Sequence, residues 1–189
     1  MAKTTTQIGL DEDFQVPLLN VFRSAAMDRD SQAKEDSAGD DDTTISRRQI
    51  ERREGASLDR LQSFFMIDLG NLLGTVHLEA TEDLSQYPGV RKSILNYGVQ
   101  DVTSLTIGSG TSEEIRKKLK DSLLDHEPRL IPESVVVRAR TGSEAENQSM
   151  AFEIEAVLAA RPVDVPLEFV AEIDTGEGKV IMSELKVHE

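Results

Sequence analysis

The sequence predicts an α+β fold in which N-terminal helices pack on a C-terminal antiparallel sheet of about four strands. Between residues 45 and 126, apolar side chains recur every three or four residues, which is typical of amphipathic helices. After Pro132 the spacing changes to strict alternation, which is typical of half-buried strands. Because the helices precede the strands instead of alternating with them, the order favours α+β over a parallel α/β sheet.

Residues 1–44 are predicted to form an acidic, flexible N-terminal arm. The middle of this arm, DRDSQAKEDSAGDDDTT, has too little apolar surface to offset the entropy lost on ordering. The preceding segment 16–23, VPLLNVFR, is an apolar island, and we predict that it docks on the body of the protein or on a neighbour. A stray helical turn is an equally good interpretation. Residues 45–189 are predicted to form one α+β domain.

The helical pattern begins at Ile45 and contains a long apolar stripe that ends before Gly74. Asp68 falls outside this stripe. A shorter helix is predicted after the sequence Tyr87-Pro88-Gly89, with Gly98 just past its end, where a left-handed residue is common. The apolar residues that we expect to face inward from these two helices are Leu58, Leu61, Phe65, Leu69, Leu72 and Leu73, followed by Val90, Ile94 and Leu95.

A third helix begins at a predicted capping box, in which Thr111 is followed three residues later by Glu114. Pro128 disfavours the helical conformation at Glu127, so this helix should end near His126. Its inward residues are predicted to be Ile115, Leu119, Leu123 and Leu124.

The strands are predicted from alternating apolar and polar residues that are separated by turn signals. A polar segment separates the first two, and residues 175–178 (TGEG) form a turn between the last two. The predicted strands cover residues 135–140, 150–158, 167–173 and 179–182.

Composition limits the partners and the compartment. The chain of 189 residues has a formal net charge of −14, which repels nucleic-acid phosphates and anionic headgroups, so no nucleic-acid partner is expected. Cysteine is absent, which excludes thiolate chemistry and favours a reducing compartment, the cytoplasm. Neither an apolar signal region nor a run of about 20 apolar residues is present, so no membrane insertion is expected.

Two short patterns that could carry chemistry are better explained without it. Residues 107–111 (IGSGT) precede a helix like a phosphate loop, but Glu113 and Glu114 in its first turn would repel a phosphate. The triplet Asp174-Thr175-Gly176 occurs in aspartic proteases, but it is present once and lies in a hairpin turn. Neither pattern predicts an active site.

Acidic residues and a histidine cluster near the end of the third helix, at Asp121, Asp125, His126 and Glu127. A lone histidine among carboxylates is weak evidence for a metal, and His126 at a helix C-terminus is explained by the helix dipole. No catalytic residue, cofactor or metal ligand is therefore predicted.

The segment Glu127-Pro128-Arg129, between the third helix and the first strand, is the strongest candidate for a binding site. Pro128 and Pro132 are expected to hold it extended, which places the side chains of Glu127 and Arg129 on the same side as a preorganised carboxylate and guanidinium. Two interpretations stay open on physical grounds. The pair could be a docking site for a partner, or an internal ion pair between helix and strand.

Several motifs support a more specific hypothesis: EDLSQYP at 82–88, VRKSILNYG at 90–98, EPRL at 127–130 and the meander from Phe152 to Met182. With these motifs the chain resembles the small baseplate wedge proteins of contractile injection machines, a family that includes the type VI secretion subunit TssE and phage tail-baseplate relatives. The apolar segment 16–23 is similar to a motif near the family's N-terminus. The chain departs from many relatives at Gly74, where they carry Asn before Thr, and in its unusually acidic linker.

The resemblance implies a structural subunit and not an enzyme. It implies that Glu127, Pro128 and Arg129 dock on the helical core bundle of the larger wedge subunits, and that the sheet templates the contractile sheath. The implied partners are the wedge subunits TssF, TssG and TssK, the sheath proteins TssB and TssC, and the spike protein VgrG, assembled at the cytoplasmic face of the inner membrane.

Two alternatives remain for the function. A phage tail baseplate protein shares all of these physical features. A peptidoglycan-cleaving muramidase is the less favoured alternative, because no second carboxylate is identifiable beside Glu127 and the chain has no Trp and two Tyr to line a saccharide cleft.

Overall fold

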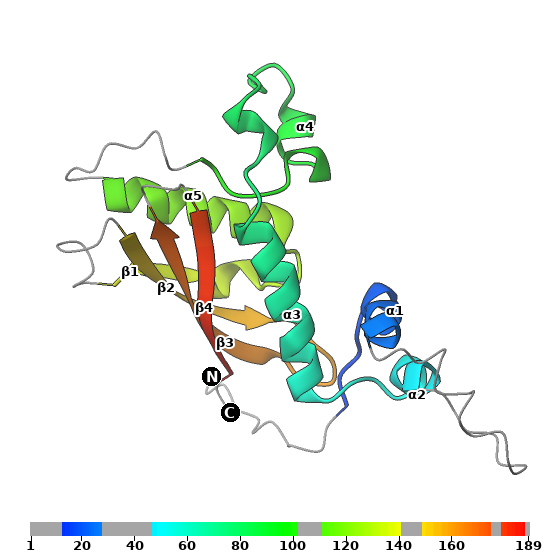
Figure 1. The fold of residues 1–189 in the computed structure, drawn as a ribbon. Coiled ribbons are helices and arrows are strands. Elements are labelled where there is room, and N and C mark those ends of the chain that lie inside the picture. The colour runs from blue at the N-terminus through cyan, green and yellow to red at the C-terminus, as the bar shows by residue number, and fades with distance from the viewer. Residues whose placement is uncertain (1–12, 28–46, 102–110, 141–148, 175–178, 188–189) are drawn as a thin grey trace, which may run out of the picture. The chain divides into compact units, whose positions relative to one another are not determined.

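Figure 1 shows the computed structural model of the protein, which describes residues 13–27, 47–101, 111–140, 149–174 and 179–187. The chain divides into two compact units. The first comprises Met1–Phe65 and Ala160–Val163, and the second comprises Met66–Ala159 and Asp164–Glu189. The boundary falls within helix α3 (Leu58–Leu73), so this helix contributes to both units.

The first unit contains helices α1 (Leu18–Met27) and α2 (Arg47–Arg53), which lie side by side (Figure 1). Residues 18–23 of the apolar island therefore belong to a helix of ten residues that continues to Met27. The helical pattern expected from Ile45 is interrupted at Gly55, which has a φ of +112°. A Cβ atom there would collide with the backbone of Phe14, which pairs with Ala56 through two hydrogen bonds of 2.8 and 2.9 Å.

The second unit is built on a four-stranded antiparallel sheet in the order β1-β2-β3-β4 (Figure 1). The α+β class and the meander are confirmed, and the last strand is longer than predicted. The strands are β1 (Val136–Ala139), β2 (Ser149–Leu158), β3 (Val165–Asp174) and β4 (Lys179–Val187).

The apolar core of the second unit follows the predicted alternation. On the two central strands the pairs Phe152–Ala171 and Ile154–Phe169 lie opposite one another and are buried. Helix α5 (Thr111–His126) packs against β1, and Lys120 Nζ donates a 2.7 Å hydrogen bond to the carbonyl oxygen of Val135. The helices contribute the buried residues Leu69, Leu72, Leu73, Ile115, Leu119 and Leu123, as predicted.

Residues 76–99 form a lobe between α3 and α5, and it contains η1 (Leu78–Ala80), α4 (Pro88–Arg91) and η2 (Ile94–Asn96) (Figure 1). At its base, Val99 N donates a 2.8 Å hydrogen bond to the carbonyl oxygen of Thr75. Gly98 has a φ of +129°, and a Cβ atom there would collide with the same carbonyl group. The positive φ predicted for Gly98 is confirmed.

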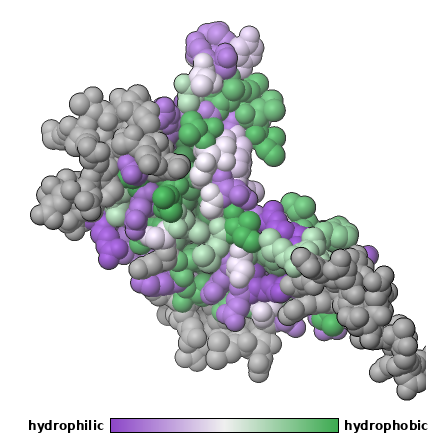
Figure 2. All heavy atoms as spheres, in the orientation of Figure 1, coloured by the Kyte–Doolittle hydropathy of each residue, from purple (hydrophilic) through white to green (hydrophobic). Residues whose placement is uncertain are grey.

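The prediction that Ile94 and Leu95 face inward is wrong, because their side chains are 84% and 67% exposed. Figure 2 shows apolar surface on this lobe. The interior position is taken by Asn96, whose Oδ1 accepts a hydrogen bond from Glu79 N and whose Nδ2 donates one to the carbonyl oxygen of Arg91, both 2.9 Å. A helical period cannot be maintained over such short elements, so hydrogen bonds to a polar side chain decide which face is buried.

Candidate functional site

The candidate site begins where α5 ends at His126, as predicted. Leu130 N donates a 3.1 Å hydrogen bond to the carbonyl oxygen of Glu127, which closes a turn with Pro128 in its second position. The expectation of an extended segment is therefore wrong here. The fixed φ of proline suits the second position of a turn as well as an extended chain.

The turn is attached to the end of strand β2. Ala159 N donates a 2.8 Å hydrogen bond to the carbonyl oxygen of Arg129, and Leu130 forms a bridge with Leu158. Leu130 is buried and Pro128 is exposed. The backbone that carries the Arg129 side chain is thus held on the sheet.

Glu127 and Arg129 form a two-pronged ion pair. Arg129 Nε donates to Glu127 Oε1 and Arg129 Nη2 donates to Glu127 Oε2, each at 2.7 Å. The Glu127 side chain is 7% exposed, whereas that of Arg129 is 23% exposed. Such bidentate pairs are among the stronger hydrogen-bonded contacts in proteins. The prediction that the two side chains lie on the same side is confirmed.

A second carboxylate joins the pair from helix α3. Arg129 Nη2 also donates a 2.9 Å hydrogen bond to Asp68 Oδ2, across 61 positions of sequence. We call these three residues the Asp68–Glu127–Arg129 cluster. With two carboxylates and one guanidinium, the cluster carries a formal charge of −1. The internal ion pair, one of the two interpretations left open by the sequence, is present, and it ties the turn to α3.

The cluster's charges determine the ionisation of its arginine. Burial by itself lowers the pKa of Arg129, but the hydrogen bond and charge of Glu127, together with those of Asp68, outweigh burial and raise the pKa above its usual value. Arg129 therefore stays charged. Removing it would leave the buried Glu127 carboxylate without its principal hydrogen-bond donor, which is costly.

Tyr97 connects the lobe to this cluster. Its hydroxyl donates a 3.4 Å hydrogen bond to the backbone carbonyl of Asp68, and its ring packs edge-on against His126 with centroids 5.6 Å apart. Burial is the largest cause that raises the pKa of Tyr97, followed by the negative charges of Asp68 and Glu127, while Arg129 opposes them. The phenol is therefore a local reporter of the cluster's charge.

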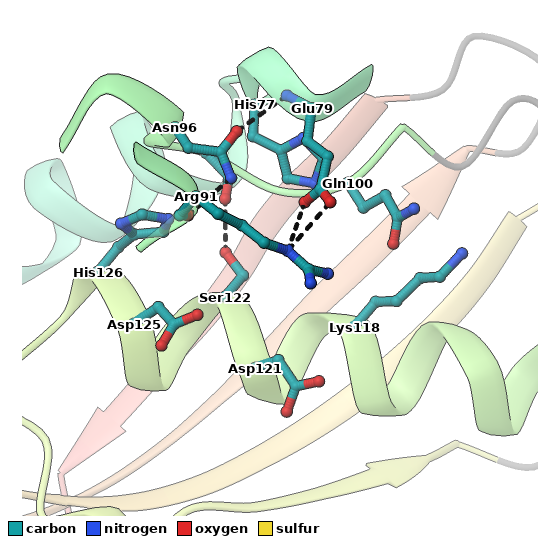
Figure 3. A pocket seen from close by; sticks show the side chains of 11 residues that line it. His77, Glu79, Arg91, Asn96, Gln100, Lys118, Asp121, Ser122, Asp125 and His126 are labelled. Carbon is teal, nitrogen blue, oxygen red and sulfur yellow. Dashed lines mark hydrogen bonds and ion pairs between the residues drawn. The ribbon is translucent and has the colours of Figure 1, made fainter. Parts of the chain in front are cut away.

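A polar depression of about 90 Å³ lies between the lobe and α5 (Figure 3). Its cationic side chains are paired: Arg91 Nε lies 3.0 Å from a carboxylate oxygen of Glu79, and Lys118 Nζ lies 2.6 Å from one of Glu114. Ser122 Oγ of α5 donates a 2.6 Å hydrogen bond to the carbonyl oxygen of Gly98. The hydrogen bond from Ser122 connects α5 to the lobe, whereas each of the two ion pairs lies within one of them.

The candidate metal cluster at the end of α5 is not assembled as a site. Asp121, Asp125 and His126 line the depression in Figure 3, whereas Glu127 is engaged by Arg129. Within the described ranges, no three or more His, Asp and Glu side chains come together in a group that could hold a metal ion.

Three sequence features lie partly or wholly outside the described residues. They are most of the arm 1–44, the glycine-rich segment 107–110 with the side chain of Thr111, and the turn 175–178 with the end of the aspartic-protease triplet.

Two members of the site, Asp68 and Tyr97, were missed by sequence reasoning. Asp68 lies beside the buried Leu69 on α3, so the pattern shows that it borders the core. No local pattern indicates which distant residue it meets. Tyr97 precedes the glycine that closes the lobe, and that position likewise says nothing about a contact with α3.

The fold and the site define a class of protein: an α+β protein whose distinctive groups are paired charges that hold a surface turn in place. The family model described as "Baseplate wedge protein gp25" matches residues 66–163, which include the whole Asp68–Glu127–Arg129 cluster and Tyr97. The chain belongs to this family. No curated protein and no solved structure matches the chain.

Family membership supports a structural role in a baseplate. In the part of the chain that the structure describes, no helix combines the length and the apolar character needed to cross a bilayer.

Proposed function

We propose that this chain is the small wedge subunit of a type VI secretion baseplate. In this proposal it docks on the helical core bundle of the larger wedge subunits through Glu127, Pro128 and Arg129. Its sheet is the surface on which the contractile sheath begins to assemble. The proposed partners are TssF, TssG and TssK in the wedge and TssB and TssC in the sheath. The observation that carries the docking site is the preformed cluster of Asp68, Glu127 and Arg129 beside an exposed proline.

A partner that binds this surface meets side chains that are already ordered. The bidentate contact and the bond to Asp68 fix the guanidinium plane before binding, so little side-chain entropy remains to be lost. Glu127 is almost fully buried, so its role in docking is to position Arg129. Arg129 and Pro128 are the residues with surface for a partner to contact.

The docking proposal is tested by replacing Arg129 with alanine and measuring two properties: co-purification with the co-expressed wedge subunits, and sheath assembly in cells. Arg91→Ala is the matched control, because Arg91 forms a more exposed ion pair with Glu79 in the same unit. We expect Arg129→Ala to abolish both properties and Arg91→Ala to retain them.

Each variant is assayed at a temperature below its own unfolding midpoint, so that a loss of assembly cannot be caused by unfolding of the variant. Wild-type levels of sheath in the folded Arg129→Ala variant would reject the docking role.

For the sheath, we propose strand β4 as the edge that pairs with a sheath subunit. Both β1 and β4 are edge strands in the described sheet, but β4 has nine residues and β1 has four. A longer edge offers more main-chain hydrogen bonds to an added strand, which is how strand addition gains affinity.

No specific observation favours a muramidase. Two carboxylates lie close together, but Asp68 and Glu127 both accept hydrogen bonds from the same guanidinium. They are therefore not placed to flank a glycosidic bond. A phage tail baseplate shares the physical features of the proposed site, and the neighbouring genes would separate the two machines.

A further inference from the structure

Helix α1 is amphipathic, but its apolar face is exposed and its more polar face is buried. It buries Asn20, Val21 and Ser24, and it exposes the apolar stripe of Leu18, Leu19, Phe22 and Ala26. Leu19 and Phe22 are 67% and 53% exposed. A surface helix normally turns its apolar stripe toward the protein. Figure 2 shows apolar surface where Figure 1 places α1.

A buried polar network fixes this orientation. Ser24 Oγ donates a 3.2 Å hydrogen bond to Glu51 Oε1 of α2, and Arg60 Nε lies 2.5 Å from the same oxygen. Arg60 Nη2 also donates to Ser24 Oγ. Rolling α1 to bury Leu19 would take Ser24 away from the buried Glu51 carboxylate, and a buried charge that loses its hydrogen bonds is costly. The exposed stripe is therefore built into the unit.

The two helices carry charge opposite to that of the whole chain. Together α1 and α2 contain five arginines and one glutamate, whereas the chain has a net charge of −14. The single glutamate, Glu51, is buried and paired with Arg60. Arg52 and Arg53 are exposed, and the structure gives neither an ion-pair partner within the residues it describes. Among the side chains that the structure describes on this helix pair, the exposed surface thus combines the apolar stripe of α1 with the basic residues Arg52 and Arg53.

We propose that the α1–α2 surface, defined by Leu18, Leu19, Phe22, Arg52 and Arg53, docks in an apolar groove with an acidic rim on another baseplate subunit. This inference rests on the proposed baseplate role and adds a second contact to it. Leu19 and Phe22, three positions apart on one helix face, are the anchors of a helix that binds in a groove. The arginines supply the complementary charge for the rim.

Other occupants fit the charges less well. In a two-fold dimer through this surface, each basic helix pair would face a copy of itself, and like charges would repel. An anionic membrane would be repelled by the net charge of the whole chain. A protein groove with acidic residues at its rim has neither problem.

The occupant is identified by placing a photo-crosslinking amino acid at position 19 of the full-length chain and co-expressing it with the wedge subunits. We expect a crosslink to another subunit, at a segment that contains Asp or Glu beside apolar residues. A crosslink within the same chain, to a second copy or to no protein would overturn the proposal.

Affinity for the purified wedge subunits provides the second measurement. We expect Leu19→Ser/Phe22→Ser to bind at least tenfold more weakly and Ile94→Ser/Leu95→Ser, a similarly exposed apolar pair on the lobe, to bind like the wild type. Arg52→Glu/Arg53→Glu should weaken binding most at low salt. Equal affinity of the Leu19/Phe22 variant and the wild type, or equal losses in both serine pairs, would overturn the proposal.

Different results would reject the baseplate role and the docking of the α1–α2 surface. If the wild-type chain does not bind the wedge subunits, the baseplate role itself is rejected. If the wild type binds and the Leu19/Phe22 variant binds equally well, the α1–α2 proposal alone is rejected.

Discussion

Glu127 is an acidic residue in a buried position, and its neighbours explain why it is tolerated there. Its two carboxylate oxygens accept the two donors of one guanidinium, whose second nitrogen also reaches Asp68. Removing one member of such a pair costs more than the pair itself contributes, because the remaining charge stays buried. The cluster's effect on stability is therefore measured best by comparing single and double variants.

We expect Arg129→Ala to lower the free energy of unfolding by about 3 kcal/mol, because the buried Glu127 loses its partner. The double variant Glu127→Gln/Arg129→Met should be less destabilised than Arg129→Ala, since no unpaired buried charge remains. Urea denaturation followed by circular dichroism gives both values. Arg91→Ala, in an exposed pair, should change stability by less than about 1 kcal/mol. Equal losses in Arg129→Ala and Arg91→Ala would contradict this account.

Tyr97 should titrate above the range of a free tyrosine, and tyrosinate absorbance compared between the wild type and Tyr97→Phe isolates its signal. Arg129→Ala should raise the pKa of Tyr97 further and Asp68→Asn should lower it, because these residues oppose and promote the shift respectively. Folding raises the pKa of this phenol, so its contribution to stability is fully present below the pKa of about 10 that it has in the unfolded chain. This contribution is lost as the pH rises through the pKa of the folded state. Identical Tyr97 titrations in the wild type, Arg129→Ala and Asp68→Asn would show that the cluster does not act on the phenol.

Sequence reasoning at the residue scale found the members of the site that are close together in the chain. Glu127 and Arg129 are separated by one proline, so their proximity follows from local geometry. Asp68 and Tyr97 reach the same site by tertiary packing, which no local spacing encodes.

At the scale of elements, Gly98 shows where backbone conformation decides the structure. We expect Gly98→Ala to lower the free energy of unfolding by about 2 kcal/mol or more, because its φ of +129° and the nearby Thr75 carbonyl both exclude a Cβ atom. Gly70→Ala, in α3 with no heavy atom within 4 Å of the new Cβ, should be neutral or stabilising by up to about 1 kcal/mol. Thermal unfolding of the two variants is the measurement, and a neutral Gly98→Ala would contradict the close approach.

The lobe should depend on Asn96 more than on its exposed apolar residues. Asn96→Ala removes two hydrogen bonds and leaves Glu79 N and the Arg91 carbonyl without them, so we expect a loss of about 1–3 kcal/mol and faster amide hydrogen exchange in residues 78–97. Ile94→Ser/Leu95→Ser should leave exchange in the lobe unchanged. Equal protection in all three proteins would show that Asn96 does not hold the lobe together.

Hydrophobic period predicted the long elements well and the lobe poorly. The stripes of α3 and α5 and the alternation of β2 and β3 each span ten or more residues, so many side chains agree on one face. In the lobe, Asn96 is buried and Ile94 is exposed, so hydrogen bonding opposes the apolar pattern. The break at Gly55 was missed because its cause, the backbone of Phe14, is about 40 residues away in sequence.

At the scale of the whole molecule, the edge strands β1 and β4 are expected to differ in their importance for sheath assembly. Ile181 lies exposed on β4 and Val136 lies exposed on β1. A lysine on an edge strand discourages pairing with another chain. We expect Ile181→Lys to block sheath extension in cells and Val136→Lys to permit it, with both proteins folded. The opposite pattern would assign the sheath contact to β1.

The meander also has a consequence for how the subunit is made. Each strand pairs with the strand next to it along the chain, so the sheet forms through contacts at short sequence separation, and such topologies fold quickly. The contact between Asp68 and Arg129 closes a much longer loop, across 61 positions, and the sheet can form without it. We therefore expect the sheet to form early and the charged cluster to close late, so that the proposed docking surface becomes competent only after the sheet beneath it is complete.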